Sequence, residues 1–133
     1  MNPRYPHVAL RASHRCEYCH APEAVFNFPF EVDHIIPVVQ EGGEADTNLA
    51  LACRSCNLGK AAHASGIDPE TRVEVRLFDP RQEVWERHFQ ADPRSGEIRG
   101  LTAIGRATVA QLEMNSRLQV AARQQWMRLG LFP

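Results

Sequence analysis

The fold of this 133-residue chain is decided by residues 16–60, which read CEYCHAPEAVFNFPFEVDHIIPVVQEGGEADTNLALACRSCNLGK. Two Cys-x-x-Cys pairs bound this stretch, Cys16 with Cys19 and Cys53 with Cys56. A thiolate pair at this spacing can bind one metal ion from a tight turn, and two pairs complete a tetrahedral site. Zinc suits four soft thiolates in a closed tetrahedron, so we predict a structural Zn²⁺ site.

Redox-active pairs and disulfides are the alternative interpretations of the same four cysteines. Residues 1–13 show no secretory signal, and no apolar run approaches the roughly 20 residues of a membrane helix. We therefore expect a cytoplasmic protein without membrane contact, where thiols stay reduced, which favours metal binding over disulfides. Four protein ligands leave no open coordination position, so we do not expect the zinc ion to be the catalyst.

The residues between the two cysteine pairs predict a small mixed unit. Apolar residues alternate with polar or small ones from Phe26 to Val32, which predicts a half-buried strand that ends at Asp33-His34. Three further elements are predicted: a turn at Gly42-Gly43, a second strand at residues 48–52 and a helix at residues 54–64 that ends near Gly66.

The rest of the chain predicts strands followed by helices. We expect a strand at residues 73–77 paired with one at residues 84–89, a third strand at residues 98–101, and helices from about residue 103. An apolar stripe on the last helix would consist of Leu118, Ala122, Trp126 and Leu129. The chain is therefore expected to be an α+β protein in two parts: residues 1–66 with the zinc site, and residues 67–133 as a β-hairpin and C-terminal helices packed on it.

Charge is distributed unevenly along the chain. The formal net charge of −1 does not support nucleic-acid binding by itself. Residues 98–133, however, contain five arginines against the single acidic residue Glu113. Such a basic segment could follow a phosphate backbone or simply form a solvated helix face, and the sequence leaves both interpretations open.

Taken in order, the motifs resemble those of the HNH endonuclease family over residues 14–64. The matching elements are Cys16-x-x-Cys19, Val32-Asp33-His34-Ile35-Ile36-Pro37, Gly42-Gly43, Asn48-Leu49 and Cys53-x-x-Cys56-Asn57-x-x-Lys60. The resemblance implies a ββα-metal unit and a metal-dependent hydrolase of phosphodiester bonds, most consistent with DNA as the partner.

The same residues suit that chemistry. A neutral imidazole can remove a proton from water near pH 7, and the oxygens of an aspartate and an asparagine are hard ligands for Mg²⁺ or Mn²⁺. The resemblance implies that His34 is the general base and that Asp33 and Asn57 hold the catalytic ion. It also implies that Asn48 holds the loop and orients His34 through hydrogen bonds.

Two basic residues also belong to the expected site, and the sequence differs from many relatives at positions where they have histidine. Arg54 and Lys60 could contact phosphate. Many relatives have histidine at the position of Asn57, and some have a further histidine at the position of Ala61. The absence of these imidazoles favours Mg²⁺ or Mn²⁺ over zinc as the catalytic ion.

Each residue also has a simpler interpretation. Asp33-His34 could form a strand-end salt bridge, and the asparagines could serve turns and helix caps. Two alternative functions follow: a catalytically inactive zinc-containing module that binds nucleic acid, or a zinc-stapled protein-interaction domain. The sequence leaves open whether the substrate is DNA or RNA and whether it is single- or double-stranded. It also leaves open the sequence specificity, the biological pathway and the oligomeric state.

Overall fold

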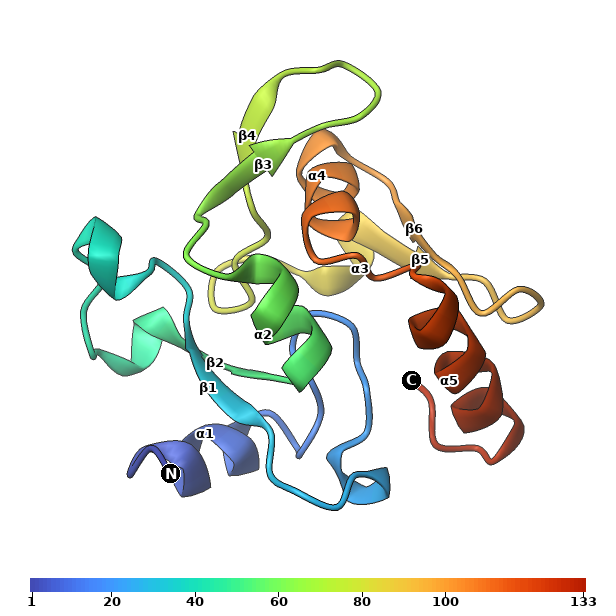
Figure 1. Cartoon of the computed structure of the whole chain (residues 1–133), viewed down its shortest axis with the longest axis horizontal. Helices are drawn as coiled ribbons and strands as arrows, with labels where there is room; N and C mark the ends of the chain where they lie inside the picture. The colour runs from blue at the N-terminus through green and yellow to red at the C-terminus, as the bar shows by residue number, and fades with distance from the viewer.

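Strands β1 (Glu31–His34) and β2 (Leu49–Ala52) form an antiparallel pair in the computed structural model, which describes residues 1–133 (Figure 1). All four residues of β2 are buried, so this strand forms part of the core. Helix α2 (Arg54–Lys60) follows β2 directly and packs against both strands. The predicted second strand and the helix after it are therefore present.

Short helices surround this unit. Helix α1 (Tyr5–Arg11) packs against β2 and β1, and a proline in its first turn suits a position where the backbone N–H has no helical partner. Three single turns of 3₁₀ helix occupy the connections: η1 (Glu23–Val25), η2 (Val38–Gln40) and η3 (Asp46–Asn48).

The first predicted strand was too long. It was expected from Phe26, but β1 begins only at Glu31, and Phe28 is 46% exposed. Pro29 has no N–H to donate, and the N–H of Phe30 bonds to the carboxylate of Glu23 at 2.7 Å. The backbone before β1 is therefore bonded to a side chain instead of a neighbouring strand.

Helix α2 is also shorter than the predicted 54–64. It ends at Lys60, and Ala61 has a positive φ of 49° that leaves the helical region. Residues Ser65–Ile67 form β3, which pairs antiparallel with β4 (Glu74–Arg76). The carbonyl of Ala64 also accepts from the N–H of Leu77 at 2.9 Å, so pairing with the next strand along the chain outweighs the helix propensity of the alanines.

The predicted pairing of residues 73–77 with residues 84–89 is wrong. The partner of β4 is β3, and Trp85–His88 form the short helix α3. Strand β5 (Phe89–Ala91) pairs instead with β6 (Ile98–Gly100), which confirms the third predicted strand. The indole N–H of Trp85 donates to the carbonyl of Tyr18 at 2.8 Å, so a long-range contact fixes this segment.

The predicted C-terminal helices are present as α4 (Ala103–Gln111) and α5 (Arg117–Arg128). The apolar stripe on α5 is only half right, because Trp126 is buried whereas Leu118 is 84% exposed and Leu129 is 69% exposed. Arg123 is buried on this helix instead. Its guanidinium donates to the carbonyls of Gly96 and Met114 at 2.7 and 2.8 Å, which satisfies most of its polar atoms.

One cluster of 22 buried residues runs through both halves of the chain. It contains the four cysteines and the residues of β2 together with Phe89, Ile98, Leu112 and Trp126 from the second half. The C-terminal elements therefore pack on the part that carries the cysteines. No helix has the length and apolar character needed to span a membrane.

Candidate active site and metal centre

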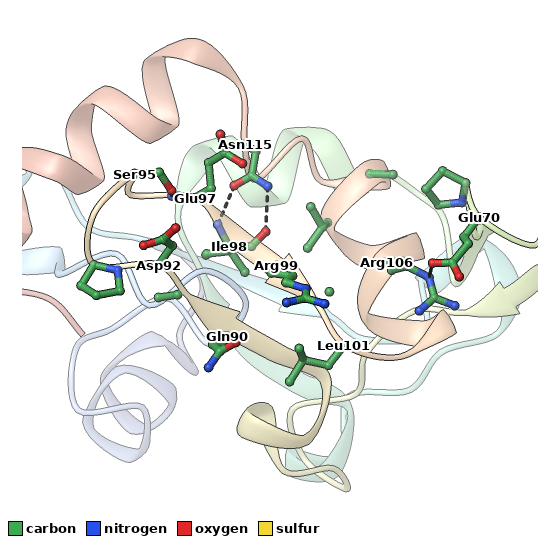
Figure 2. Close-up of a pocket in the computed structure, with 16 residues that line it drawn as sticks. Glu70, Gln90, Asp92, Ser95, Glu97, Ile98, Arg99, Leu101, Arg106 and Asn115 are labelled. Atoms are coloured by element: carbon green, nitrogen blue, oxygen red, sulfur yellow. Dashed lines mark hydrogen bonds and ion pairs between the residues drawn. The ribbon is translucent and has the colours of Figure 1, made fainter.

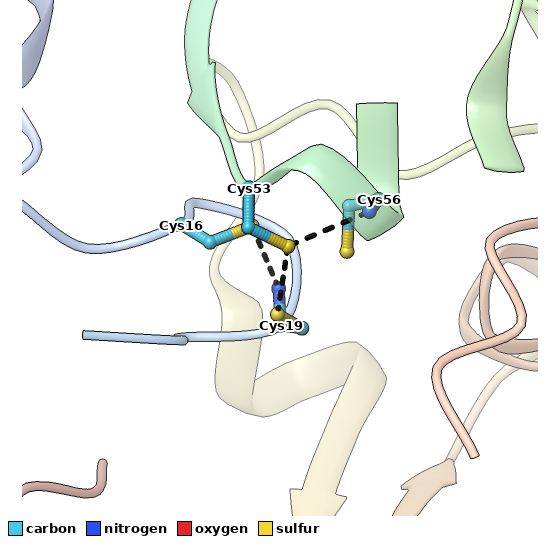
Figure 3. A group of neighbouring side chains, drawn as sticks. All are labelled: Cys16, Cys19, Cys53 and Cys56. Atoms are coloured by element: carbon cyan, nitrogen blue, oxygen red, sulfur yellow. Dashed lines mark hydrogen bonds between the residues drawn. The ribbon is translucent and has the colours of Figure 1, made fainter. Parts of the chain in front are cut away.

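Four cysteines meet between the loop after α1 and the start of α2 (Figure 3). Their Sγ atoms all lie within 4.8 Å of one another, all four residues are buried, and none forms a disulfide. Zn–S bonds of about 2.3 Å at tetrahedral angles place sulfur atoms about 3.8 Å apart. The Sγ atoms of Cys19 and Cys53 are 3.7 Å apart, so the donor set fits zinc.

The two pairs share the same local geometry. The N–H of Cys19 points to Sγ of Cys16, and the N–H of Cys56 points to Sγ of Cys53, each at 3.4 Å. Cys53 is also the N-cap of α2, so the helix begins at a metal ligand. Backbone N–H groups that face sulfur stabilise its thiolate form.

The close approach of four buried thiols shifts their pKa values in opposite directions. Hydrogen bonds from Cys16 and the other thiols lower the pKa of Cys53. Hydrogen bonding to Cys16 and the others, together with burial, raises the pKa of Cys56. Four buried thiolates are stable together only around a positive ion, which is the role that zinc would fill.

Asp33 lies at the point where three segments meet. Its Oδ2 accepts a hydrogen bond of 2.7 Å from the hydroxyl of Tyr18, which lies between the first two cysteines. The Nζ atom of Lys60 lies 3.2 Å from Oδ2 and 3.3 Å from Oδ1, and it also donates to the carbonyl of His34 at 2.9 Å. Burial raises the pKa of Asp33, and the ammonium charge of Lys60 opposes part of that rise.

Lys60 therefore has a different position from the one expected for a phosphate contact. The residue is 1% exposed, and its ammonium group lies inside the protein against Asp33. A contact with substrate phosphate would require this group to leave a buried carboxylate. Lys60 instead joins α2 to β1 beside the predicted catalytic pair.

His34 and Asn48 lie on either side of the connection between β1 and β2. The Nε2 atom of His34 lies 2.8 Å from Oε1 of Glu44. The side-chain amide of Asn48 accepts from the N–H of Ile36 and donates to the carbonyls of Ile36 and Gly43, at 2.8 to 3.1 Å. The side chain of Asn48 thus binds backbone groups of the loop, and none of these hydrogen bonds goes to the imidazole of His34.

Asn57 faces Glu31, a residue that was not predicted from the sequence. The Nδ2 group of Asn57 donates to Oε2 of Glu31, and NH1 of Arg54 lies 3.2 Å from the other oxygen, Oε1. The strand period of two could have indicated Glu31, because it lies two residues before Asp33 and therefore on the same face of β1. Arg54 remains largely exposed.

Three of the predicted residues line one cavity of about 230 Å³ beside β1 and α2: Asp33, His34 and Asn57. The other lining residues are Val32, Pro37, Val38, Val39, Ala61 and Ala62. Asn48, Arg54 and Lys60 are not among them. The fold therefore brings Asp33, His34 and Asn57 to one cavity, and the remaining predicted residues do not line it.

A larger cavity lies elsewhere in the molecule. It has a volume of about 900 Å³ and is lined by residues of β5, β6 and α4 (Figure 2). Arg106 contacts Glu70 at one end, and the side-chain amide of Asn115 bonds both the N–H and the carbonyl of Ile98 at 2.7 Å. None of the predicted site residues lines this cavity.

Comparison with known families gives one match, which lies in the first half of the chain. The family model described as HNH endonuclease matches residues 16–63, a range that holds both cysteine pairs and the three cavity residues. Searches of curated proteins and of solved structures found no match. Residues 16–63 of this chain therefore match the HNH endonuclease family, and their cluster of four cysteines fits zinc.

Proposed function

We propose that the protein is a metal-dependent endonuclease that hydrolyses phosphodiester bonds, with DNA as its substrate. The observation that carries this proposal is the cavity shared by Asp33, His34 and Asn57 within the HNH domain. In this proposal β1, β2 and α2 form the ββα-metal unit of the family. A binding or interaction module would have no need of these three side chains around one cavity.

The two kinds of metal would have separate roles. The four cysteines would hold structural zinc, because four protein ligands leave no position for water. Asn57 and Asp33 would hold Mg²⁺ or Mn²⁺. The Oδ1 atom of Asn57 has no hydrogen-bond partner in the protein, and Oδ1 of Asp33 has only Lys60 at 3.3 Å, so both offer free lone pairs. A divalent ion bound there would supply positive charge to balance the charge that develops on the phosphate.

His34 would act as the general base. The carboxylate of Glu44 can only accept a hydrogen bond, so it favours the imidazole tautomer whose proton is on Nε2. Nδ1 then keeps the lone pair that can take a proton from water. Since the side chain is 21% exposed, water can reach it from the cavity.

Contacts with the substrate backbone are proposed for exposed arginines. Arg54 lies in α2, three residues before Asn57, and is 59% exposed in its side chain. Its contact with Glu31 uses only NH1, so its other N–H groups can bind phosphate. Of the five arginines in residues 98–133, Arg123 is buried and Arg106 is paired with Asp68. The other three make no ion pair and remain available to phosphate: Arg99, Arg117 and Arg128.

A plasmid assay tests the proposal. Zinc-loaded protein would be incubated with supercoiled DNA, with and without Mg²⁺ or Mn²⁺, alongside His34→Ala. We expect nicking that requires the added ion and falls by at least about 100-fold in the variant, since general-base catalysis contributes roughly 10²- to 10⁴-fold. The zinc content and the circular dichroism spectrum of the variant should match those of the wild type.

The absence of nicking with any ion, in protein that retains zinc, would contradict the proposal for this DNA. Short RNA and branched DNA would then be the next substrates. If these also stay intact, a gel-shift titration separates the two alternatives. A mobility shift would support a zinc-containing nucleic-acid-binding module, and none would favour a protein-interaction domain.

A further inference from the structure

The geometry points to Glu31 as a positioning residue that sets the orientation of the Asn57 amide and so creates the ligand oxygen of the catalytic ion. The inference rests on the proposed function. Its basis is the contact in which Nδ2 of Asn57 donates to Oε2 of Glu31 at the edge of the cavity.

Strand β1 and helix α2 face each other through two matched contacts. Glu31 and Asp33 lie two residues apart on one face of the strand. Asn57 and Lys60 lie three residues apart on one face of the helix. Asn57 meets Glu31 and Lys60 meets Asp33, so each strand carboxylate receives a donor from the helix.

An asparagine amide needs such a partner if it is to serve as a metal ligand. The torsion that turns the amide is broad and nearly two-fold, so a free side chain presents either its oxygen or its NH₂ group to the cavity. A carboxylate can only accept, and it therefore selects the NH₂ group for itself. Glu31 thus directs Nδ2 of Asn57 away from the ligand position and leaves Oδ1 for the ion.

Glu31 is itself held in place at both oxygens. Oε2 receives the amide of Asn57, and Oε1 lies 3.2 Å from NH1 of Arg54. The side chain of Glu31 is 34% exposed and that of Arg54 is 59% exposed, so the ion pair adds little to stability. The ion pair instead fixes the orientation of the Glu31 carboxylate, which cannot turn away from Asn57 without breaking its contact with Arg54.

The first experiment measures metal binding directly. Zinc-loaded wild type and Glu31→Gln would be titrated with Mn²⁺, with the free ion followed by electron paramagnetic resonance. The glutamine amide can either donate or accept, so it no longer selects one orientation of Asn57. We expect Mn²⁺ binding to weaken roughly tenfold, in line with the loss of other groups that orient metal ligands. The Mg²⁺ concentration for half-maximal nicking should rise by a similar factor.

A matched control, Glu41→Gln, removes one negative charge from another glutamate in the same part of the chain. Glu41 is exposed, makes no ion pair, and lies in the loop that follows β1. Glu41→Gln should leave Mn²⁺ binding and the Mg²⁺ requirement at wild-type values. A similar weakening in both variants would overturn the inference, because it would assign the effect to net charge near the site.

A second pair of variants tests the direction of the hydrogen bond. Asn57→Asp places a carboxylate against that of Glu31, and the two should repel each other. Adding Glu31→Gln to this variant restores a hydrogen bond in the opposite direction, because the amide at position 31 now donates to the carboxylate at position 57. We expect the glutamine to weaken Mn²⁺ binding with asparagine at position 57 and to strengthen it severalfold with aspartate there. The same sign in both backgrounds would overturn the inference.

The outcomes separate this inference from the proposed function. Wild-type protein that binds Mn²⁺ and nicks DNA, with Glu31→Gln unchanged in both assays, would overturn the role of Glu31 alone. Wild-type protein that binds no Mn²⁺ and nicks no substrate would overturn both. Zinc content and thermal unfolding, measured for every variant, would identify any loss due to misfolding.

Discussion

Lys60 and Asp33 form a buried ion pair between α2 and β1, directly beside His34. A buried pair of this kind contributes little net stability compared with apolar residues, but removing one partner leaves an uncompensated charge. Tyr18 adds a third member, because its hydroxyl bonds to the same carboxylate. Its burial, followed by the Asp33 charge, raises the pKa of Tyr18, so it remains a neutral donor.

At the residue scale, we predict unequal costs for removing the two partners of Asp33. Lys60→Met should lower the free energy of unfolding by about 3 kcal/mol at pH 7, because the carboxylate loses its cation in a buried site. Tyr18→Phe should cost only about 1 kcal/mol, the net value of one hydrogen bond. Urea unfolding of zinc-loaded proteins measures both. Equal costs would show that the ion pair is not the main contact of Asp33.

At the element scale, α2 contributes four of the predicted site residues from a helix of only seven residues: Arg54, Cys56, Asn57 and Lys60. A helix of this length is not stable alone, since nucleation is costly and isolated helices need roughly 12 to 15 residues. Its N-terminus is held by Cys53 and Cys56, and its last residue, Lys60, is held by Asp33. The position of Asn57 between these two anchors therefore depends on both.

Removal of zinc should therefore abolish activity even though no cavity residue is mutated. We predict that a chelator releases the metal, reduces helix content and stops nicking even when Mg²⁺ is present in excess, because α2 loses its N-terminal anchor. Adding Zn²⁺ back should restore both signals. Cys56→Ala should behave like the chelated protein but without recovery. Nicking by metal-stripped protein at the wild-type rate would contradict this prediction. Zinc content, circular dichroism and the plasmid assay provide the measurements.

At the scale of the whole molecule, contacts from the second half support the cysteine loop. The indole N–H of Trp85 bonds to the carbonyl of Tyr18, and the ring of His20 stacks on that indole at 4.0 Å. Burial lowers the pKa of His20, which favours a neutral ring in this stack. Farther away, Asp68 after β3 accepts two hydrogen bonds of 2.9 Å from Arg106 in α4.

The Asp68–Arg106 contact predicts a pH dependence of stability. Hydrogen bonds from Arg106 hold the pKa of Asp68 well below its usual range. A carboxyl group whose pKa is lower in the folded state stabilises the fold above its unfolded pKa of about 3.9 and loses that effect as the pH falls. Asp68→Asn should therefore be less stable than wild type at pH 7, and the difference should shrink below about pH 4. Thermal unfolding of both proteins across this range tests the trend, and a constant difference would contradict it.

Much of the site could be predicted from the sequence because its parts are local. The Cys-x-x-Cys spacing indicates a metal knuckle, and Asp33-His34 at a strand end is a feature of neighbouring residues. The burial of Arg123 and the helix at Trp85–His88 could not be predicted in this way. Each depends on partners distant in the chain, such as Tyr18 for Trp85.

Local patterns of residues were enough to predict the four-cysteine cluster, the HNH segment and the order of strand, strand and helix, because spacing and periodicity act over a few residues. Three-dimensional packing, in contrast, buries Lys60 against Asp33 and brings the amide of Asn57 to Glu31. Both contacts cross from β1 to α2, and the depth at which the helix packs on the strand decides whether a lysine faces solvent or a carboxylate. That depth follows from the whole core, and no local pattern of residues encodes it.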